Sequence, residues 1–151
     1  MKHLEYTIDI SVPAEKVWNI MLNEQSYKQW VATAWPNSSY KGKWEQGTEI
    51  SFLSPGEGGI KARLDIVKPY EHVLATHIAL VDKDGNEERS AERSNGLIGT
   101  REEYRFKEAN GKTTLTVIIE TDPAWVEMFN DGWPTALEDL KNMCEKESVG
   151  V

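Results

Sequence analysis

The stretch from Asp122 to Lys146, DPAWVEMFNDGWPTALEDLKNMCEK, decides the fold. Its apolar residues recur three or four positions apart, which places them on one stripe of a helix with 3.6 residues per turn. The members of this stripe are Val126, Phe129, Trp133, Leu137, Leu140 and Cys144. We therefore predict a long amphipathic helix whose stripe lies on an apolar surface formed by the rest of the chain.

The start and the middle of this helix carry further signals. Asp122 followed by Pro123 is typical of a helix start, because an Asp side chain accepts backbone amide protons and proline is tolerated in the first turn. Pro134 has no amide proton and crowds the carbonyl four residues earlier. The sequence therefore predicts a kink or two abutting helices at Gly132–Pro134.

Upstream, the chain reads as one sheet with two short helices near its start. Apolar and polar residues alternate from His3 to Val12, which is typical of a half-buried strand. Two short helices are predicted at 14–22 and 23–30. Six further strands are predicted at 38–44, 48–53, 60–66, 73–81, 100–107 and 114–120. Residues 82–95 are polar and show neither period, so we expect a solvated loop there rather than a functional lid.

This element order predicts the fold class. Consecutive strands joined by short turns form an antiparallel meander. We expect an α+β helix-grip fold, in which a curved antiparallel sheet of about seven strands wraps around the long C-terminal helix. The two short helices after the first strand close one end, which leaves a pocket between helix and sheet. Residues 1–151 fit one domain of ordinary size.

The amino-acid composition disfavours several classes of binding partner. The chain has 25 acidic and 17 basic residues and a net charge of −8, which disfavours nucleic acid and anionic membranes. No apolar run approaches the roughly 20 residues that span a bilayer. Because there is one cysteine and no signal-peptide pattern, we expect a cytoplasmic location. The three histidines lack zinc-site spacing, so we expect no metal and no cofactor.

Asn110-Gly111 is a strong hairpin signal, because both central residues of a type I′ turn need positive φ. A two-residue turn at this place puts Tyr104 opposite Val117 and Glu102 opposite Ile119. These side chains share one face, which we expect to be the inner one. Glu102 is then the polar group on an otherwise apolar face.

The preceding strand is joined to this hairpin through the long polar loop, so its register is less defined. One register places His77 opposite Glu102 and Ala75 opposite Tyr104, with His77 facing inward. His77 and Glu102 would then form a polar pair in the cavity. In a rival register His77 faces outward and larger side chains face inward. These are Leu74, Ile78 and Leu80.

Five segments, in this order, resemble the START and birch-pollen-allergen superfamily (SRPBCC). They are Ile10–Trp18 (ISVPAEKVW), Tyr40–Gly47 (YKGKWEQG), Ile66–Tyr70 (IVKPY), Glu102–Tyr104 (EEY) and Gly132–Leu137 (GWPTAL). More closely, they resemble the branch related to the C-terminal domain of the activator of the heat-shock-ninety chaperone ATPase. The resemblance implies the helix-grip fold over essentially the full length. Members of the superfamily include ligand carriers, polyketide cyclases and co-chaperones, so the resemblance does not specify an activity.

We predict a non-enzymatic protein that binds a small hydrophobic or aromatic molecule in the cavity between the C-terminal helix and the sheet. The predicted ligand-binding residues are Trp30, Trp35, Trp44, Phe52, Leu64, His77, Glu102, Tyr104 and Trp133. One alternative, implied by the resemblance, is a co-chaperone-like module that contacts a chaperone. Another is a cyclase-type or hydrolase-type enzyme that uses His77 and Glu102 as acid and base. We expect a monomer or a weak homodimer.

Overall fold

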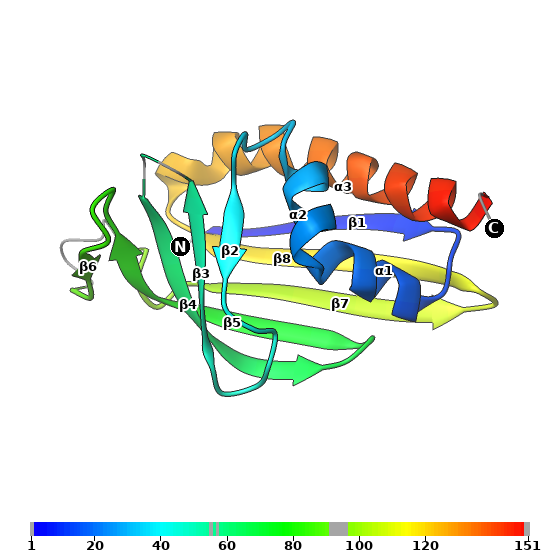
Figure 1. The fold of residues 1–151 in the computed structure, drawn as a ribbon, viewed down its shortest axis with the longest axis horizontal. Coiled ribbons are helices and arrows are strands. Elements are labelled where there is room, and N and C mark those ends of the chain that lie inside the picture. Colours follow the sequence, from blue (N-terminus) through cyan, green and yellow to red (C-terminus); the bar gives the residue numbers. More distant parts are fainter. Residues whose placement is uncertain (1, 55, 57, 91–96, 150–151) are drawn as a thin grey trace.

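The computed structural model describes residues 2–54, 56, 58–90 and 97–149, and it confirms the α+β fold (Figure 1). Residues 91–95 of the predicted polar loop lie outside the described residues. Along the chain, the elements are β1 Lys2–Ile10, α1 Ala14–Leu22, α2 Glu24–Val31, β2 Ser39–Lys41, β3 Glu49–Ser54, β4 Gly58–Lys68, β5 His72–Val81, β6 Glu87–Glu88, β7 Arg101–Ala109, β8 Lys112–Thr121, the 3-10 helix η1 Pro123–Trp125 and α3 Val126–Val149.

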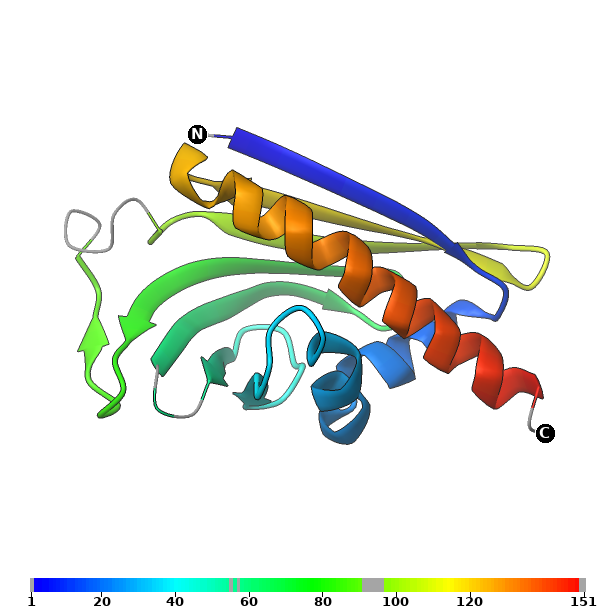
Figure 2. The ribbon, with the colours of Figure 1, turned by 90° about the horizontal axis from the view of Figure 1, so that it is seen from above.

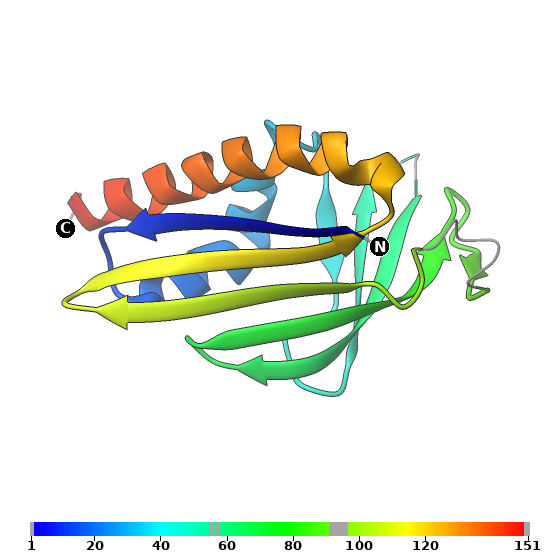
Figure 3. The same ribbon diagram turned by 180° about the vertical axis from the view of Figure 1, so that it is seen from behind.

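All described strands belong to one antiparallel sheet in the order β1-β8-β7-β5-β4-β3-β2. The short strand β6 pairs with the end of β5, inside a segment where the sequence predicts only a loop. The sheet curves under α3, which crosses it diagonally (Figure 2). Seen from behind, the outer face of the sheet carries none of the described helices (Figure 3). The helices therefore all pack on the concave face, as the helix-grip prediction requires.

The β7–β8 hairpin has the predicted register. Asn110 and Gly111 adopt φ angles of 56° and 77°, as a type I′ turn requires. Glu102 lies opposite Ile119, and Tyr104 lies opposite Val117. The middle of the inner face of this hairpin is apolar and buried, with Tyr104, Phe106, Leu115, Val117 and Ile119 beside Glu102. It forms the floor on which α3 rests.

The predicted pairing of β5 with β7 is wrong by two residues. Ala75, and not His77, lies opposite Glu102, and Val73 lies opposite Tyr104. Long connections do not determine register, and β6 folds back on β5 instead of completing a symmetric hairpin with β7. A shift of two residues keeps each side chain on its face. His77 is therefore buried and inward, and the rival register that turns it outward is wrong.

α3 is one continuous helix that contains Pro134, so the predicted division into two helices is wrong. Its start is as predicted, because Asp122 Oδ1 accepts the Ala124 amide proton at 2.9 Å before the first turn. Pro134 lies on the exposed side of the helix, and Asn130, whose carbonyl loses its usual amide partner, is exposed too. Water can therefore satisfy that carbonyl, and the helix continues through the proline.

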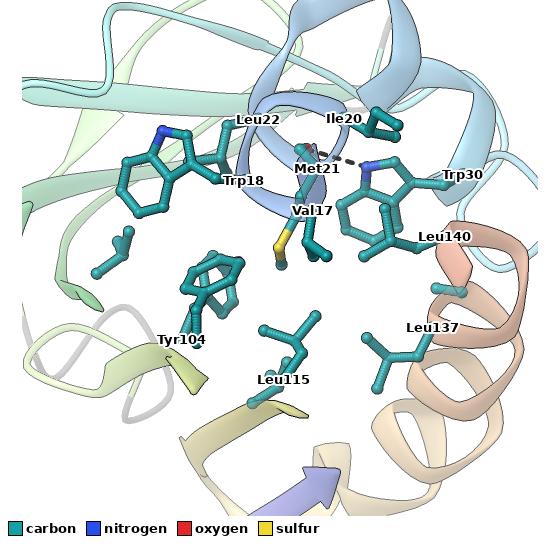
Figure 4. Close-up of a cluster of buried hydrophobic side chains, with 14 of the residues drawn as sticks. Val17, Trp18, Ile20, Met21, Leu22, Trp30, Tyr104, Leu115, Leu137 and Leu140 are labelled. Carbon is teal, nitrogen blue, oxygen red and sulfur yellow. Dashed lines mark hydrogen bonds between the residues drawn. The ribbon is translucent and has the colours of Figure 1, made fainter. Parts of the chain in front are cut away.

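The apolar stripe of α3 faces the sheet. Its four C-terminal members are buried, and its two N-terminal members are half-buried. Leu137 and Leu140 converge with Met21 of α1, Trp30 of α2 and Leu115 of β8 in a solid core (Figure 4). The indole Nε1 of Trp30 donates to the Met21 carbonyl oxygen at 3.0 Å, which joins α2 to α1. No described helix is long and apolar enough to cross a membrane.

Gly132 lets the Trp35 ring lie directly on α3. A Cβ atom at this position would lie 2.7 Å from Trp35 Cζ2 and 3.0 Å from Cε2. Trp35 also packs edge-on against Trp133, with ring centroids 5.3 Å apart. A glycine inside a helix usually costs about 0.5–1 kcal/mol relative to alanine. Here the close approach of the Trp35 ring requires it.

We therefore predict that Gly132→Ala destabilises the protein by about 1–3 kcal/mol, because the added methyl overpacks the Trp35 contact. In a Trp35→Ala background the clash is gone, and the same substitution should instead stabilise by about 0.5–1 kcal/mol. Urea denaturation of the four proteins of this cycle measures both values. An equal effect of Gly132→Ala in both backgrounds would show that Trp35 does not impose the glycine.

Candidate functional site

An inner cavity of about 210 Å³ lies between α2, α3 and the concave face of the sheet. Its wall is mostly aromatic and aliphatic, with few polar side chains. The lining residues are Tyr27, Trp30, Val31, Trp35, Ser38, Phe52, Leu53, Ser54, Ile60, His77, Leu97, Glu102, Tyr104, Phe129 and Trp133. The N-terminal half of α3 thus covers a hollow, whereas its C-terminal half covers a solid core.

Seven of the nine predicted ligand-binding residues line this cavity. They are Trp30, Trp35, Phe52, His77, Glu102, Tyr104 and Trp133. Leu64 lies elsewhere, fully buried in the core. Trp44 lies behind the wall, where its ring packs against Tyr40 and Phe52 at centroid distances of 5.6 and 5.9 Å. Trp44 therefore supports the cavity wall through Phe52, and Leu64 belongs to the core.

Several lining residues were not predicted. They are Tyr27, Val31, Ser38, Leu53, Ser54, Ile60, Leu97 and Phe129. Helical spacing could have found two of them, because residues three or four apart share a helix face. Tyr27 precedes Trp30 by three positions, and Phe129 precedes Trp133 by four. Leu97 follows the long polar segment, and the sequence carries no signal that places it here.

A wider outer hollow of about 800 Å³ adjoins the inner cavity and shares five of its lining residues. These are Trp35, Ser54, Ile60, Leu97 and Phe129. The shared wall indicates that the inner cavity opens on this side, towards β6 and the start of α3. Trp125 and Met128 flank the outer hollow and are 42% and 39% exposed.

His77 is a neutral histidine, and one of its ring nitrogens, Nδ1, is hydrogen-bonded to Thr100. Its Nδ1 lies 2.8 Å from Thr100 Oγ1, which itself donates to the Leu97 carbonyl oxygen at 2.6 Å. Because the Thr100 proton is already used, Nδ1 of His77 is the donor, and Nε2 is left as an acceptor. Burial lowers the pKa of His77 to about 4.

The pKa of Glu102 is shifted in the opposite direction to that of His77. Burial raises the pKa of its carboxyl to about 7, and a hydrogen bond with the Tyr104 side chain partly opposes this rise. Burial and the nearby Glu102 charge raise the pKa values of Tyr27 and Tyr104. Both phenols therefore stay protonated at neutral pH, whereas Glu102 is close to half ionised.

The direct His77–Glu102 pair expected from the sequence is not formed. Across the part of the chain that the structure describes, no hydrogen bond joins the two side chains. His77 contacts Thr100, and Glu102 contacts Tyr104. The two-residue shift in the β5–β7 register separates them along the strands, although both line the inner cavity. Within the described residues, no cluster of three or more His, Cys, Asp or Glu side chains could hold a metal ion.

The fold and its cavity define a helix-grip protein. The chain belongs to the family described as Activator of Hsp90 ATPase homolog 1-like protein, whose family model matches residues 11–145. This match confirms the branch of the SRPBCC superfamily that the sequence segments resemble. A comparison with curated proteins finds no match.

Solved structures share the fold. Protein MLL2253 from Mesorhizobium loti has a TM-score of 0.74 at 15% identity, covering 96% of this chain and 98% of that one. The Aha1 dimer from Colwellia psychrerythraea has a TM-score of 0.70 at 20% identity, covering 96% and 97%. DynU16, a protein in the dynemicin biosynthetic locus, has a TM-score of 0.70 at 15% identity, covering 96% of this chain and 48% of that one. At these identities the likeness shows the fold alone.

The shifted pKa values of His77 and Glu102 predict opposite effects of pH on the free energy of unfolding. Because the folded-state pKa of Glu102 lies above its ordinary 4.5, its ionisation lowers the free energy of unfolding as pH rises from 4.5 to 7. Because the folded-state pKa of His77 lies below its ordinary 6.5, its protonation lowers that free energy as pH falls from 6.5 to 4. Each contribution amounts to about 2–3 kcal/mol, and in the wild type they largely offset each other.

Single substitutions should separate these contributions. Between pH 7.5 and 4.5, we expect Glu102→Gln to lose about 2–3 kcal/mol relative to wild type, and His77→Asn to gain a similar amount. Urea denaturation followed by circular dichroism at both pH values measures these differences. Other carboxylates titrate equally in all three proteins and cancel. Differences of the same sign for the two variants, or none at all, would contradict the burial of these groups.

Proposed function

We propose that this protein binds a small aromatic or hydrophobic molecule in the inner cavity and does not transform it. The inner cavity carries this proposal, because seven of its lining side chains are aromatic and only a few are polar. Sites of this composition, an apolar wall with a small number of convergent polar groups, are typical of small-molecule binding. The aromatic members are Tyr27, Trp30, Trp35, Phe52, Tyr104, Phe129 and Trp133.

The cavity volume limits the ligand. At about 210 Å³, it is smaller than the roughly 300–1,000 Å³ of pockets for drug-sized ligands. A molecule with one ring or two fused rings suits the inner cavity, and a longer substituent would extend into the outer hollow. Burial of one such ring contributes about 2–3 kcal/mol, so a few contacts support micromolar affinity.

Intrinsic fluorescence tests this proposal, because Trp30, Trp35 and Trp133 line the inner cavity. We expect a saturable change in emission on titration with indole, 2-naphthol or p-cresol, with dissociation constants of about 1–100 µM. Ser54 lies in the wall shared with the outer hollow, so Ser54→Phe should fill the entrance and weaken binding at least about tenfold.

The matched control is Ser51→Phe, on the same strand but on the other face from buried Ile50. This variant should bind like the wild type. Flat titrations across the panel, extended to a fatty acid, a sterol and a flavonoid, would refute the proposal. Equal binding by the Ser54→Phe variant and the wild type would place the ligand outside the inner cavity.

Contact with a chaperone is the second candidate function, and family membership together with one surface feature favours it. Trp125 and Met128 are large apolar residues exposed side by side at the start of α3. Exposed apolar side chains that cluster are typical of protein contacts.

In this second candidate, the protein raises the ATPase rate of an Hsp90-type chaperone, and Trp125→Ser with Met128→Ser removes the effect. Tyr70→Ser is the control, because Tyr70 is similarly exposed but packs against Trp18 at the other side of the fold. An unchanged ATPase rate with the wild-type protein, measured by phosphate release, would reject this function.

The alternative of an enzyme that uses His77 and Glu102 as acid and base stays a prediction, since the two side chains share the cavity but contact different partners.

A further inference from the structure

Among the described residues, the charged side chains that line the inner cavity and the outer hollow are acidic. Four carboxyl groups line them: Glu102 inside, and Asp82, Glu87 and Glu88 in the outer hollow. Among the described residues, neither wall includes a Lys or an Arg. A ligand that enters this space therefore meets a negative electrostatic potential.

In the outer hollow, part of this charge is neutralised. Glu87 pairs with Lys61 at 2.5 Å and with Arg89 at 2.6 Å. Asp82 accepts the backbone amide protons of Asp84 and Asn86, both at 2.9 Å. These groups face solvent, where salt screens their effect on a ligand. Charge selectivity therefore has to come from Glu102.

Glu102 has no cationic neighbour in the described part of the inner cavity. The titratable groups that face it are His77 from β5, Tyr27 from α2 and Tyr104 from its own strand. His77 is neutral, and the two phenols carry no positive charge. The residues that α3 and β3 present to the cavity are aromatic, aliphatic or hydroxyl side chains, which have no charge at neutral pH.

The walls around Glu102 also suit a cation. Trp133 lies at the centre of a ring cluster, with Trp35 at 5.3 Å and with Trp30 and Tyr104 both at 6.1 Å between centroids. The faces of aromatic rings carry negative potential and attract ammonium groups, and indole does so most strongly. An ammonium ion in the cavity would therefore be favoured by both the carboxylate and the rings.

We propose that the inner cavity selects a small organic amine, whose ammonium group pairs with the Glu102 carboxylate and whose hydrocarbon or aromatic body lies against the indole walls. This inference rests on the proposed function, because it names the ligand class of the same cavity. A neutral ligand that accepts a hydrogen bond from protonated Glu102 is the competing chemistry, and it has the opposite pH dependence.

The pH dependence follows from linkage. An amine binds the ionised carboxylate, so its affinity is full above pH 8 and falls as pH drops through the pKa of Glu102, about 7. Between pH 8 and pH 6 the ionised fraction, and with it the affinity, decreases about tenfold. The ligand contributes nothing to this change, because alkylamines titrate near the lysine value of about 10.4.

Isothermal titration calorimetry with three matched probes tests the inference: 2-phenylethylamine, 2-phenylethanol and phenylacetate. We expect the amine to bind at least about tenfold more tightly than the alcohol at pH 8. Its affinity should fall about tenfold at pH 6, while the alcohol changes little. Phenylacetate should bind most weakly at pH 8, because its charge repels Glu102.

Glu102→Gln should weaken amine binding about 10-fold to 100-fold at pH 8, remove the pH dependence, and leave binding of the alcohol nearly unchanged. Glu103→Gln is the matched control. Glu103 is the next residue of β7, points to the outer face and contacts His72 at 2.5 Å. The Glu103→Gln variant should bind the amine like the wild type.

The outcomes separate the two proposals. If the alcohol binds as tightly as the amine at pH 8, or if the amine gains affinity as pH falls, the amine inference is overturned while small-aromatic binding stands. If none of the three probes binds and the fluorescence titrations are flat, both proposals fail. The pH profile of the wild-type protein needs no variant, so the inference can be refuted even if Glu102→Gln does not fold.

Discussion

The burial of one stripe of α3 is the constraint on which the rest of the structure depends. A helix with this many apolar residues on one side has to be covered, and the concave face of the sheet is the surface that covers it. Burial of each large side chain contributes about 1.5–3 kcal/mol. From Leu137 to Cys144 the stripe packs in a solid core, whereas Phe129 and Trp133 lie beside the inner cavity. One helix thus stabilises the fold at one end and covers the inner cavity at the other.

The buried ionisable groups follow from this arrangement. An apolar wall removes water from His77 and Glu102 and disfavours the charged form of each. The resulting pKa shifts, down for His77 and up for Glu102, mean that both groups reduce the free energy of unfolding in part of the pH range. Natural sequences often violate the rule of an apolar interior at functional sites. The contributions of these two groups to the pH dependence of the free energy of unfolding therefore oppose each other.

Local patterns predicted most of the fold, and long-range contacts account for the errors. The stripe of α3 and the Asn110-Gly111 turn are readable because helical spacing and positive φ depend on neighbours in the sequence. The β5–β7 register is not readable, since the connection contains β6 and is not a symmetric hairpin. The site was predicted from its large aromatic residues. Alternation assigns a side chain to the inner face, but it cannot separate cavity wall from core, so Leu64 was assigned to the wall wrongly.

The turn at Asn110-Gly111 also determines the chemistry of the cavity. β7 carries two adjacent glutamates, and side chains alternate along a strand. With the two-residue turn, Glu102 faces the inner cavity and Glu103 faces the outer surface, where it pairs with His72 and Arg105. A slip of one residue would exchange the two faces. It would place Tyr104 and Phe106 in water, so the burial of these rings excludes it. The hydrophobic contacts that hold the hairpin under α3 therefore also determine which carboxyl group lies in the inner cavity.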